Sequence, residues 1–173
     1  MLNIVDDATR YQWTKNLKTA KTDDVIIQHI KELKIADEII VRRIRCDNRI
    51  VTNKFTAFCE EEGIRLETIA PHRHHMGGVI ERANRTTRDR TAVILGDGQL
   101  GADKPIMRTI LRILDAKTRE SLENTTLPEK LWPEAYHHAV YLKNRTPTRA
   151  LKSDKTPYKA LYSRKPDISI LQP

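Results

Sequence analysis

The alternation of short β-branched runs with helical segments over residues 1–95 limits the fold of this chain more than any other feature. Two short runs separated by a polar turn predict an antiparallel hairpin, at residues 2–6 and 11–17. Apolar residues at helical spacing predict helices over 22–34, 51–62 and 79–95, and β-rich runs predict strands over 38–46 and 64–69. Gly63 stands where the second helix ends, a place typical of the left-handed residue that closes a helix. The order β, β, α, β, α, β, α predicts an α/β domain.

Positive charge is in excess, with 31 Lys and Arg against 23 Asp and Glu and a formal net charge of +8. The phosphate backbone is the commonest large anionic partner of a basic soluble domain, so the excess favours nucleic-acid binding; the alternative is surface charge that serves only solubility. Because apolar runs reach four residues at most, we expect neither a membrane span nor a secretory leader. Cys46 and Cys59 lack the spacing of a metal or redox motif, and we expect both to be small buried side chains.

Two carboxylates stand out by their positions. Asp47 follows the predicted strand 38–46, and Glu81 lies in the first turn of the helix that Gly77 and Gly78 introduce. Sites in α/β sheets gather at strand ends and helix starts, so the two carboxylates are candidates to share a divalent cation. The alternatives are structural, with Asp47 capping the next helix and Glu81 placed favourably in the helix dipole.

A series of motifs surrounds these carboxylates in a fixed order. They read DDATRYQW at 6–13, IRCDN at 44–48, GI at 63–64 leading to AP at 70–71, GVIERANRT at 78–86, LPEKLWPEA at 127–135 and YLKNRTPT at 141–148. Three shorter ones follow, TPY at 156–158, LY at 161–162 and KPDIS at 165–169. Together, over nearly the whole chain, they closely resemble the integrase catalytic core of copia-type LTR retrotransposons, a relative of retroviral integrase with the ribonuclease H-like fold.

The resemblance implies a polynucleotidyl transferase that joins element DNA to a target and holds Mg²⁺ or Mn²⁺ with two aspartates and one glutamate. By motif position Asp47 is the second aspartate and Glu81 the glutamate. The first aspartate lies in the family on the strand before residues 2–6, so we expect a fold that lacks its first strand. The resemblance gives Asp6 and Asp7 no metal role, and we expect activity to be weak or lost because two carboxylates do not fix two metal ions.

The helix that carries Glu81 also predicts a nucleic-acid-binding face. Asn84, Arg85 and Arg88 follow Glu81 at +3, +4 and +7, so they share its face and can hold a phosphate close to the metal. The alternative is a solvated face on which Glu81 and Arg85 form an exposed ion pair. The histidines of the loop at 71–76 lack a helical ligand spacing, so we do not expect a zinc site there. The resemblance implies instead a basic loop that contacts DNA.

We therefore predict a DNA-integration protein, the integrase core of a retrotransposon polyprotein. The alternative function is that of a non-catalytic remnant that binds DNA or RNA. A plain ribonuclease H-like nuclease is disfavoured by the integrase-specific motifs at 127–148. We predict a truncated core over 1–95, a glycine-rich loop or insertion over 96–104, the helical remainder of the core over 105–145 and a proline-containing extension over 146–173. Expected partners are element and target DNA and further copies of the chain in a homo-oligomer, without a membrane, at an intracellular, nuclear location.

Overall fold

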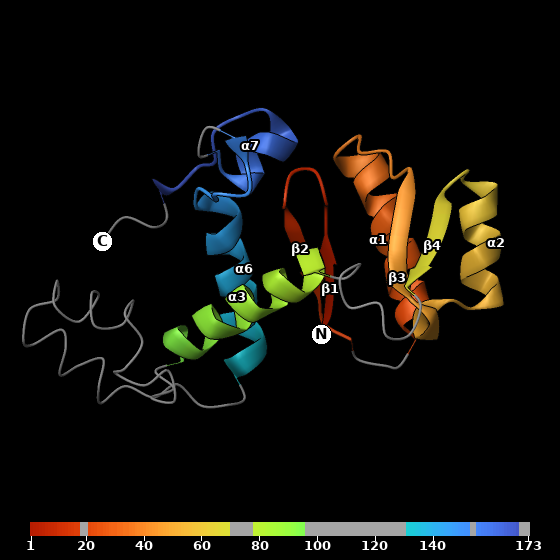
Figure 1. Ribbon diagram of the computed structural model, residues 1–173, viewed down its shortest axis with the longest axis horizontal. Coiled ribbons are helices and arrows are strands. Elements are labelled where there is room, and N and C mark those ends of the chain that lie inside the picture. The colour runs from red at the N-terminus through yellow and green to blue at the C-terminus, as the bar shows by residue number, and fades with distance from the viewer. Residues whose placement is uncertain (18–20, 70–77, 96–130, 153–154, 170–173) are drawn as a thin grey trace, which may run out of the picture. The chain divides into compact units, whose positions relative to one another are not determined.

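The computed structural model describes residues 1–17, 21–69, 78–95, 131–152 and 155–169 (Figure 1). The chain forms two compact units, one made of residues 1–2 and 15–79 and the other of residues 3–14 and 80–173. The loop at 71–76, the segment 96–104 and residues 105–130 of the predicted helical remainder lie outside the described residues.

The first unit is built on a parallel pair of strands. β3 (Arg43–Asp47) pairs with β4 (Arg65–Ile69) in a register that places Arg43 opposite Arg65 and Asp47 opposite Ile69. The crossover between them holds a short 3₁₀ turn, η1 (Asn48–Ile50), and α2 (Asn53–Glu61), and α1 (Thr22–Ala36) precedes β3. In Figure 1, β3 and β4 lie side by side, and α2 packs against both α1 and β4. The parallel pairing follows from the helical connection, because parallel strands require a long crossover.

The core of this unit is apolar and comes from the helical periodicity of the sequence. The side chains that share it are Ile26, Ile30 and Leu33 of α1 and Phe55, Phe58 and Cys59 of α2. The hydroxyl of Thr52 accepts from the Phe55 N–H at 3.2 Å and caps α2, and Gly63 follows the helix with φ of 67°. The predictions of a left-handed Gly63 and of a buried Cys59 are therefore confirmed; Cys46 is only half-buried.

The prediction of a strand over 38–46 is wrong at its N-terminal end, since β3 begins only at Arg43. The end of α1 explains the difference. The Ile39 N–H donates to the Leu33 carbonyl at 3.0 Å, and Glu38 adopts a left-handed φ of 56°, so this segment closes the helix. An N–H that is used in this way cannot join a β ladder. Ile40 is left exposed outside any strand.

The second unit contains the N-terminal hairpin and the described helices of the C-terminal half. The hairpin is β1 (Leu2–Val5) with β2 (Gln12–Lys15), which form a two-stranded sheet of their own. The helices are α3 (Gly78–Ile94), α6 (Trp132–Arg145) and α7 (Pro157–Tyr162). Most of α3 belongs to this unit. The predicted hairpin and the predicted helix over 79–95 are confirmed.

A buried polar network centred on Gln12, which is 1% exposed, joins β2 to α6 and α3. The Gln12 N–H donates to Asn144 Oδ1 at 3.0 Å, and Asn144 Nδ2 donates to the Gln12 carbonyl at 2.8 Å. The side-chain oxygen of Gln12 accepts from Thr87 Oγ1 at 3.0 Å and from Lys143 Nζ at 2.5 Å. Since buried polar groups are stable only when they are hydrogen-bonded, this network fixes β2 against both helices.

The extension predicted over 146–173 contains α7, which packs on α6 and, through aromatic rings, on Tyr11, the residue before β2. The centroid of the Tyr11 ring lies 5.6 Å from that of Tyr162 and 6.4 Å from that of Tyr158. The Arg145 guanidinium stacks over Tyr141 at 3.5 Å from the ring centroid and reaches Tyr158 at 5.0 Å. Such ring and cation contacts stabilise the packing beyond the area they bury. In the described part of the chain no helix has the length and apolar character needed to cross a membrane.

Candidate functional site

Asp47 is exposed at the carboxyl end of β3, in the position that the sequence predicts. Its Oδ1 accepts a hydrogen bond from the Arg49 N–H at 3.1 Å and caps η1. Asp47 thus caps this 3₁₀ turn, whereas the predicted helix that follows, α2, is capped by Thr52. The cap uses one carboxylate oxygen, and within the described residues Oδ2 has no hydrogen-bond partner, so that oxygen stays open to a cation. The cap also fixes the backbone that follows the strand, where the sequence has no glycine.

Glu81 is exposed in the first turn of α3. The exposed ion pair between Glu81 and Arg85, weighed as an alternative, is absent from the ion pairs of the described residues. A carboxylate in the first turn is favoured by the partial positive charge of the helix N-terminus. Glu81 thus presents an exposed carboxylate at the start of α3.

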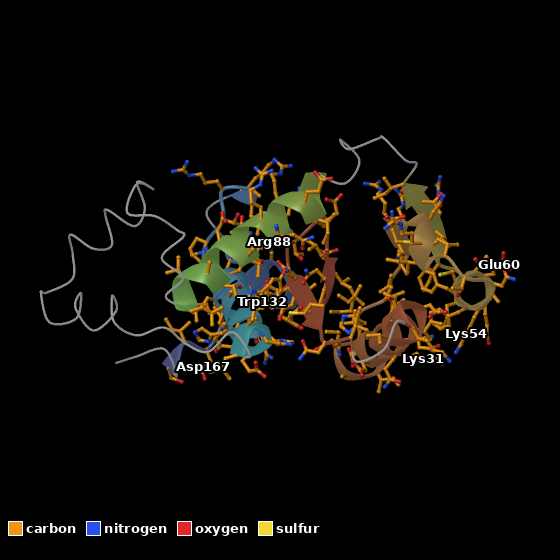
Figure 2. The ribbon with its side chains drawn as sticks, turned by 90° about the horizontal axis from the view of Figure 1, so that it is seen from below. Lys31, Lys54, Glu60, Arg88, Trp132 and Asp167 are labelled. Carbon is orange, nitrogen blue, oxygen red and sulfur yellow. The ribbon has the colours of Figure 1, made fainter. Side chains whose placement is uncertain are left out.

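The remaining candidate residues of α3 do not all lie on its solvent-facing side. Ala83, Thr87 and Thr91, spaced four residues apart, form the buried stripe of the helix. Arg85 and Arg88 are exposed, and Figure 2 shows Arg88 on α3. Asn84 is half-buried beside the stripe, and its side-chain oxygen has no hydrogen-bond partner within the described residues. The structure therefore leaves the two arginines accessible to a ligand, while Asn84 lies at the border of the interior.

Asp6 lies in the turn between β1 and β2 and is occupied there. Its Oδ2 accepts from the Thr9 N–H at 2.8 Å and from Thr9 Oγ1 at 2.6 Å. The neighbouring Asp7 pairs with Arg10. These contacts make an Asx-type turn, the local use that aspartate commonly has in hairpins. Asp6 therefore acts as a turn residue.

Among the described residues of the second unit, Lys143 has the most strongly shifted pKa, and the sequence analysis assigns it no role. Burial lowers the pKa of its ammonium to about 8, and the nearby positive charge of Arg90 lowers it further in the same direction. Sequence offered one signal, the position of Lys143 within the motif at 141–148. Its partner Gln12 lies 131 residues away in sequence, so local patterns could not reveal the contact.

The candidate metal ligands do not form a cluster within one unit. Asp47 belongs to the first unit and Glu81 to the second. Among the residues that the structure describes, no group of three His, Cys, Asp or Glu side chains could hold a metal ion. The carboxylates nevertheless suit Mg²⁺ or Mn²⁺ chemically, since both are exposed oxygen donors, which hard cations prefer.

Comparison with known proteins supports the resemblance read from the motifs. The chain is 28% identical, over 151 residues that make up 85% of its length, to a retrovirus-related Pol polyprotein from transposon TNT 1-94 of Nicotiana tabacum. It spans only 9% of the length of that polyprotein. It is also similar to the crystal structure of the catalytic core domain of BIV integrase, with a TM-score of 0.54 and 18% identity over 93% of this chain and 84% of that one. No protein-family model matches the chain.

Together these findings confirm two of the predictions. The chain resembles an integrase-like domain of a retrotransposon polyprotein, because its sequence matches a transposon polyprotein. Its fold is the ribonuclease H-like α/β fold of a retroviral integrase core. In the described residues this fold appears as two small two-stranded sheets with flanking helices.

Proposed function

We propose that this chain is the integrase catalytic core of a retrotransposon polyprotein and that it takes part in DNA integration by metal-dependent polynucleotidyl transfer. The observation that carries the proposal is the placement of Asp47 and Glu81, two exposed carboxylates at a strand end and a helix start, in a chain with an integrase-core fold. Strand ends and helix starts are where α/β folds place their sites. The proposal rests on each carboxylate separately, because the two lie in different units.

In this function Asp47 and Glu81 would hold Mg²⁺ or Mn²⁺. Each carboxylate would supply oxygen ligands to such an ion, and the chemistry that a bound ion would supply is polarisation of phosphoryl oxygens and activation of a hydroxyl for in-line displacement. The protein's own contribution is placement. The hydrogen bond from the Arg49 N–H fixes one oxygen of Asp47, so that the other is held in a defined direction. On α3, Arg85 and Arg88 would bind the phosphate backbone as fixed positive charges, with Asn84 beside them.

We propose that activity of this chain alone is weak. Asp6, a carboxylate that could otherwise serve as a third ligand, is engaged by Thr9 in the hairpin turn. Two carboxylates hold a pair of divalent ions less firmly than three, because each ion loses oxygen ligands. A second candidate function is therefore a nucleic-acid-binding domain without catalysis. The exposure of Arg85 and Arg88, which have no ion-pair partner within the described residues, favours it.

The experiment measures strand transfer by the full chain on short labelled duplex DNA, with Mg²⁺ or Mn²⁺ and with EDTA. We expect weak, metal-dependent product that Asp47→Asn and Glu81→Gln abolish. Asp6→Asn is the matched control, since it also removes one carboxylate charge but acts on the turn. Product that Asp47→Asn and Glu81→Gln leave unchanged would contradict their proposed roles.

Binding of the same duplex separates the two candidate functions. Salt-sensitive binding that survives Glu81→Gln, without metal-dependent product, favours the non-catalytic domain. Strand transfer as efficient as that of an active retroviral integrase would contradict the proposed weakness. Absence of DNA and RNA binding at physiological salt would exclude both functions.

A further inference from the structure

One face of the β3–β4 pair carries three arginines around a single carboxylate. Side chains alternate along a strand, and residues opposite one another in a parallel pair point to the same side. Arg43 therefore shares a face with Arg65, and Arg45 shares it with Glu67. These four residues are called the arginine face below. The arginine side chains are 58%, 40% and 72% exposed for Arg43, Arg45 and Arg65, so this face of the sheet is open to solvent.

Glu67 is the shared partner of all three guanidinium groups. Its Oε2 lies 3.1 Å from Arg45 Nη2, and its Oε1 lies 3.4 Å from Arg43 Nη1 and 3.5 Å from Arg65 Nε. The hydrogen bond from Arg45 is the main reason that the pKa of Glu67 is lowered. No other described carboxylate pairs with these arginines. Within these four residues one negative charge against three positive charges leaves a surplus of two, and Asp47 at the end of β3, on the same side, reduces the surplus to one.

This arrangement is unfavourable for the sheet itself. Like charges directly opposite one another on paired strands destabilise the pair, and Arg43 stands directly opposite Arg65. Because the side chains are exposed, the three ion pairs with Glu67 contribute little to stability. Local rules of this kind are broken in proteins chiefly at functional sites. The surplus positive charge therefore points to an anionic ligand.

We propose that the arginine face binds the phosphodiester backbone of a nucleic acid, as a second contact surface in addition to α3. The inference rests on the proposed function, which supplies the nucleic acid. Guanidinium groups match phosphate oxygens with two parallel hydrogen bonds, and their planar forks suit a chain of phosphates better than isolated ammonium groups do. Glu67 holds the arginines in place in the absence of the ligand.

The position of Asp47 links this surface to the proposed chemistry. Asp47 follows Arg45 by two residues on β3, so the two share a face and their Cα atoms lie about 7 Å apart. A phosphate that Arg45 holds would consequently lie on the same side of the strand as the proposed metal ligand. Backbone contacts of this type position a nucleic acid without reading its sequence.

The test measures binding of the full chain to a short fluorescent DNA duplex by anisotropy, between about 50 and 200 mM salt. The variants are Arg43→Gln, Arg45→Gln, Arg65→Gln and Glu67→Gln. The matched control is Lys54→Gln on α2 (Figure 2), which also removes one positive charge from the first unit and whose ammonium pairs with Asp24. Far-UV circular dichroism confirms that each variant is folded.

We expect each arginine variant to reduce the slope of log K against log salt by about 1. Each phosphate contact that is lost leaves about 0.9 of a counterion bound to the DNA, which corresponds to binding about eightfold weaker at 0.1 M salt. Glu67→Gln removes the competing carboxylate and should tighten binding by up to about the same factor. Lys54→Gln should leave the slope unchanged. If the arginine variants unfold the first unit, the test rests on Glu67→Gln. A folded Glu67→Gln chain that binds the duplex no more tightly than the wild type overturns the inference.

Two further outcomes separate this inference from the proposed function. If Arg85→Gln and Arg88→Gln weaken binding while the three variants of the arginine face do not, the inference fails and the proposed function stands. If the wild-type chain binds no nucleic acid, the proposed function fails as well. Displacement of the duplex by poly-glutamate as efficiently as by unlabelled DNA of equal charge would assign the arginine face to an acidic protein and overturn the inference.

Discussion

Replacement of Lys143 by Met should stabilise the second unit at neutral pH and abolish the rise in its unfolding free energy between pH 8 and 10.5. Burial lowers the pKa of Lys143 from 10.5 to about 8 in the folded chain. A difference of 2.5 between these two values corresponds to about 3 kcal/mol, at 1.36 kcal/mol for each pH unit. Below pH 8 the folded chain holds a charged ammonium, and that charge lowers the free energy of unfolding by this amount.

The sign follows from proton binding. Between pH 8 and 10.5 the unfolded chain holds the proton of Lys143 more tightly than the folded chain does, so stability rises with pH over this interval. Met has a similar apolar length but does not titrate. It loses the hydrogen bond to Gln12, worth about 1 kcal/mol, while Gln12 keeps its bond from Thr87. At pH 7 the Lys143→Met variant should therefore be about 2 kcal/mol more stable than the wild type, or roughly 5–10 °C in Tm.

Urea unfolding followed by tryptophan fluorescence measures this change, because Trp13 and Trp132 both lie in the second unit. The difference in unfolding free energy between wild type and Lys143→Met should change by about 3 kcal/mol between pH 7 and 10.5. Lys152→Met is the control, since Lys152 is exposed in the same unit and should show no such change. A difference that stays constant between pH 7 and 10.5 would refute the argument that burial lowers the pKa of Lys143.

Two further predictions concern the first unit. Burial lowers the pKa of His29, which is 3% exposed, although Glu32 nearby opposes the shift. As the pH falls below 6.5 the unfolded chain therefore binds the proton of His29 before the folded chain does, and the folded chain loses stability. Urea unfolding followed by circular dichroism should show this loss towards pH 5 in the wild type but not in His29→Leu. A loss of equal size in His29→Leu would count against this. Glu38→Gly should raise the unfolding free energy by about 1 kcal/mol, because φ of 56° strains any residue with a Cβ. In the same urea unfolding experiments Glu60→Gly, inside α2, should lower it by about 1 kcal/mol. Destabilisation by Glu38→Gly would show that the left-handed residue carries no strain.

The positions of the candidate site residues could be predicted because they depend on local patterns. Asp47 at the end of a strand and Glu81 at the start of a helix follow from periodicity over a few residues, and so do the exposed positions of Arg85 and Arg88. The limits of β3 could not be predicted in this way. Residues 39–41 have the composition of a strand, but the hydrogen bond from the Ile39 N–H to the Leu33 carbonyl closes α1 and leaves these residues outside β3.

The sequence by itself therefore determined the order of helices and strands, the carboxylates at their ends and the resemblance to integrase cores, because each of these is encoded by neighbouring residues. Only the tertiary structure decided which side chains share an environment. It places Lys143 against Gln12 and Asn3 against Tyr136 across 131 and 133 residues of sequence, and it gathers Arg43, Arg45 and Arg65 around Glu67. The pKa of Lys143 and the charge of the arginine face depend on burial and on partners from distant segments. No local pattern specifies these quantities.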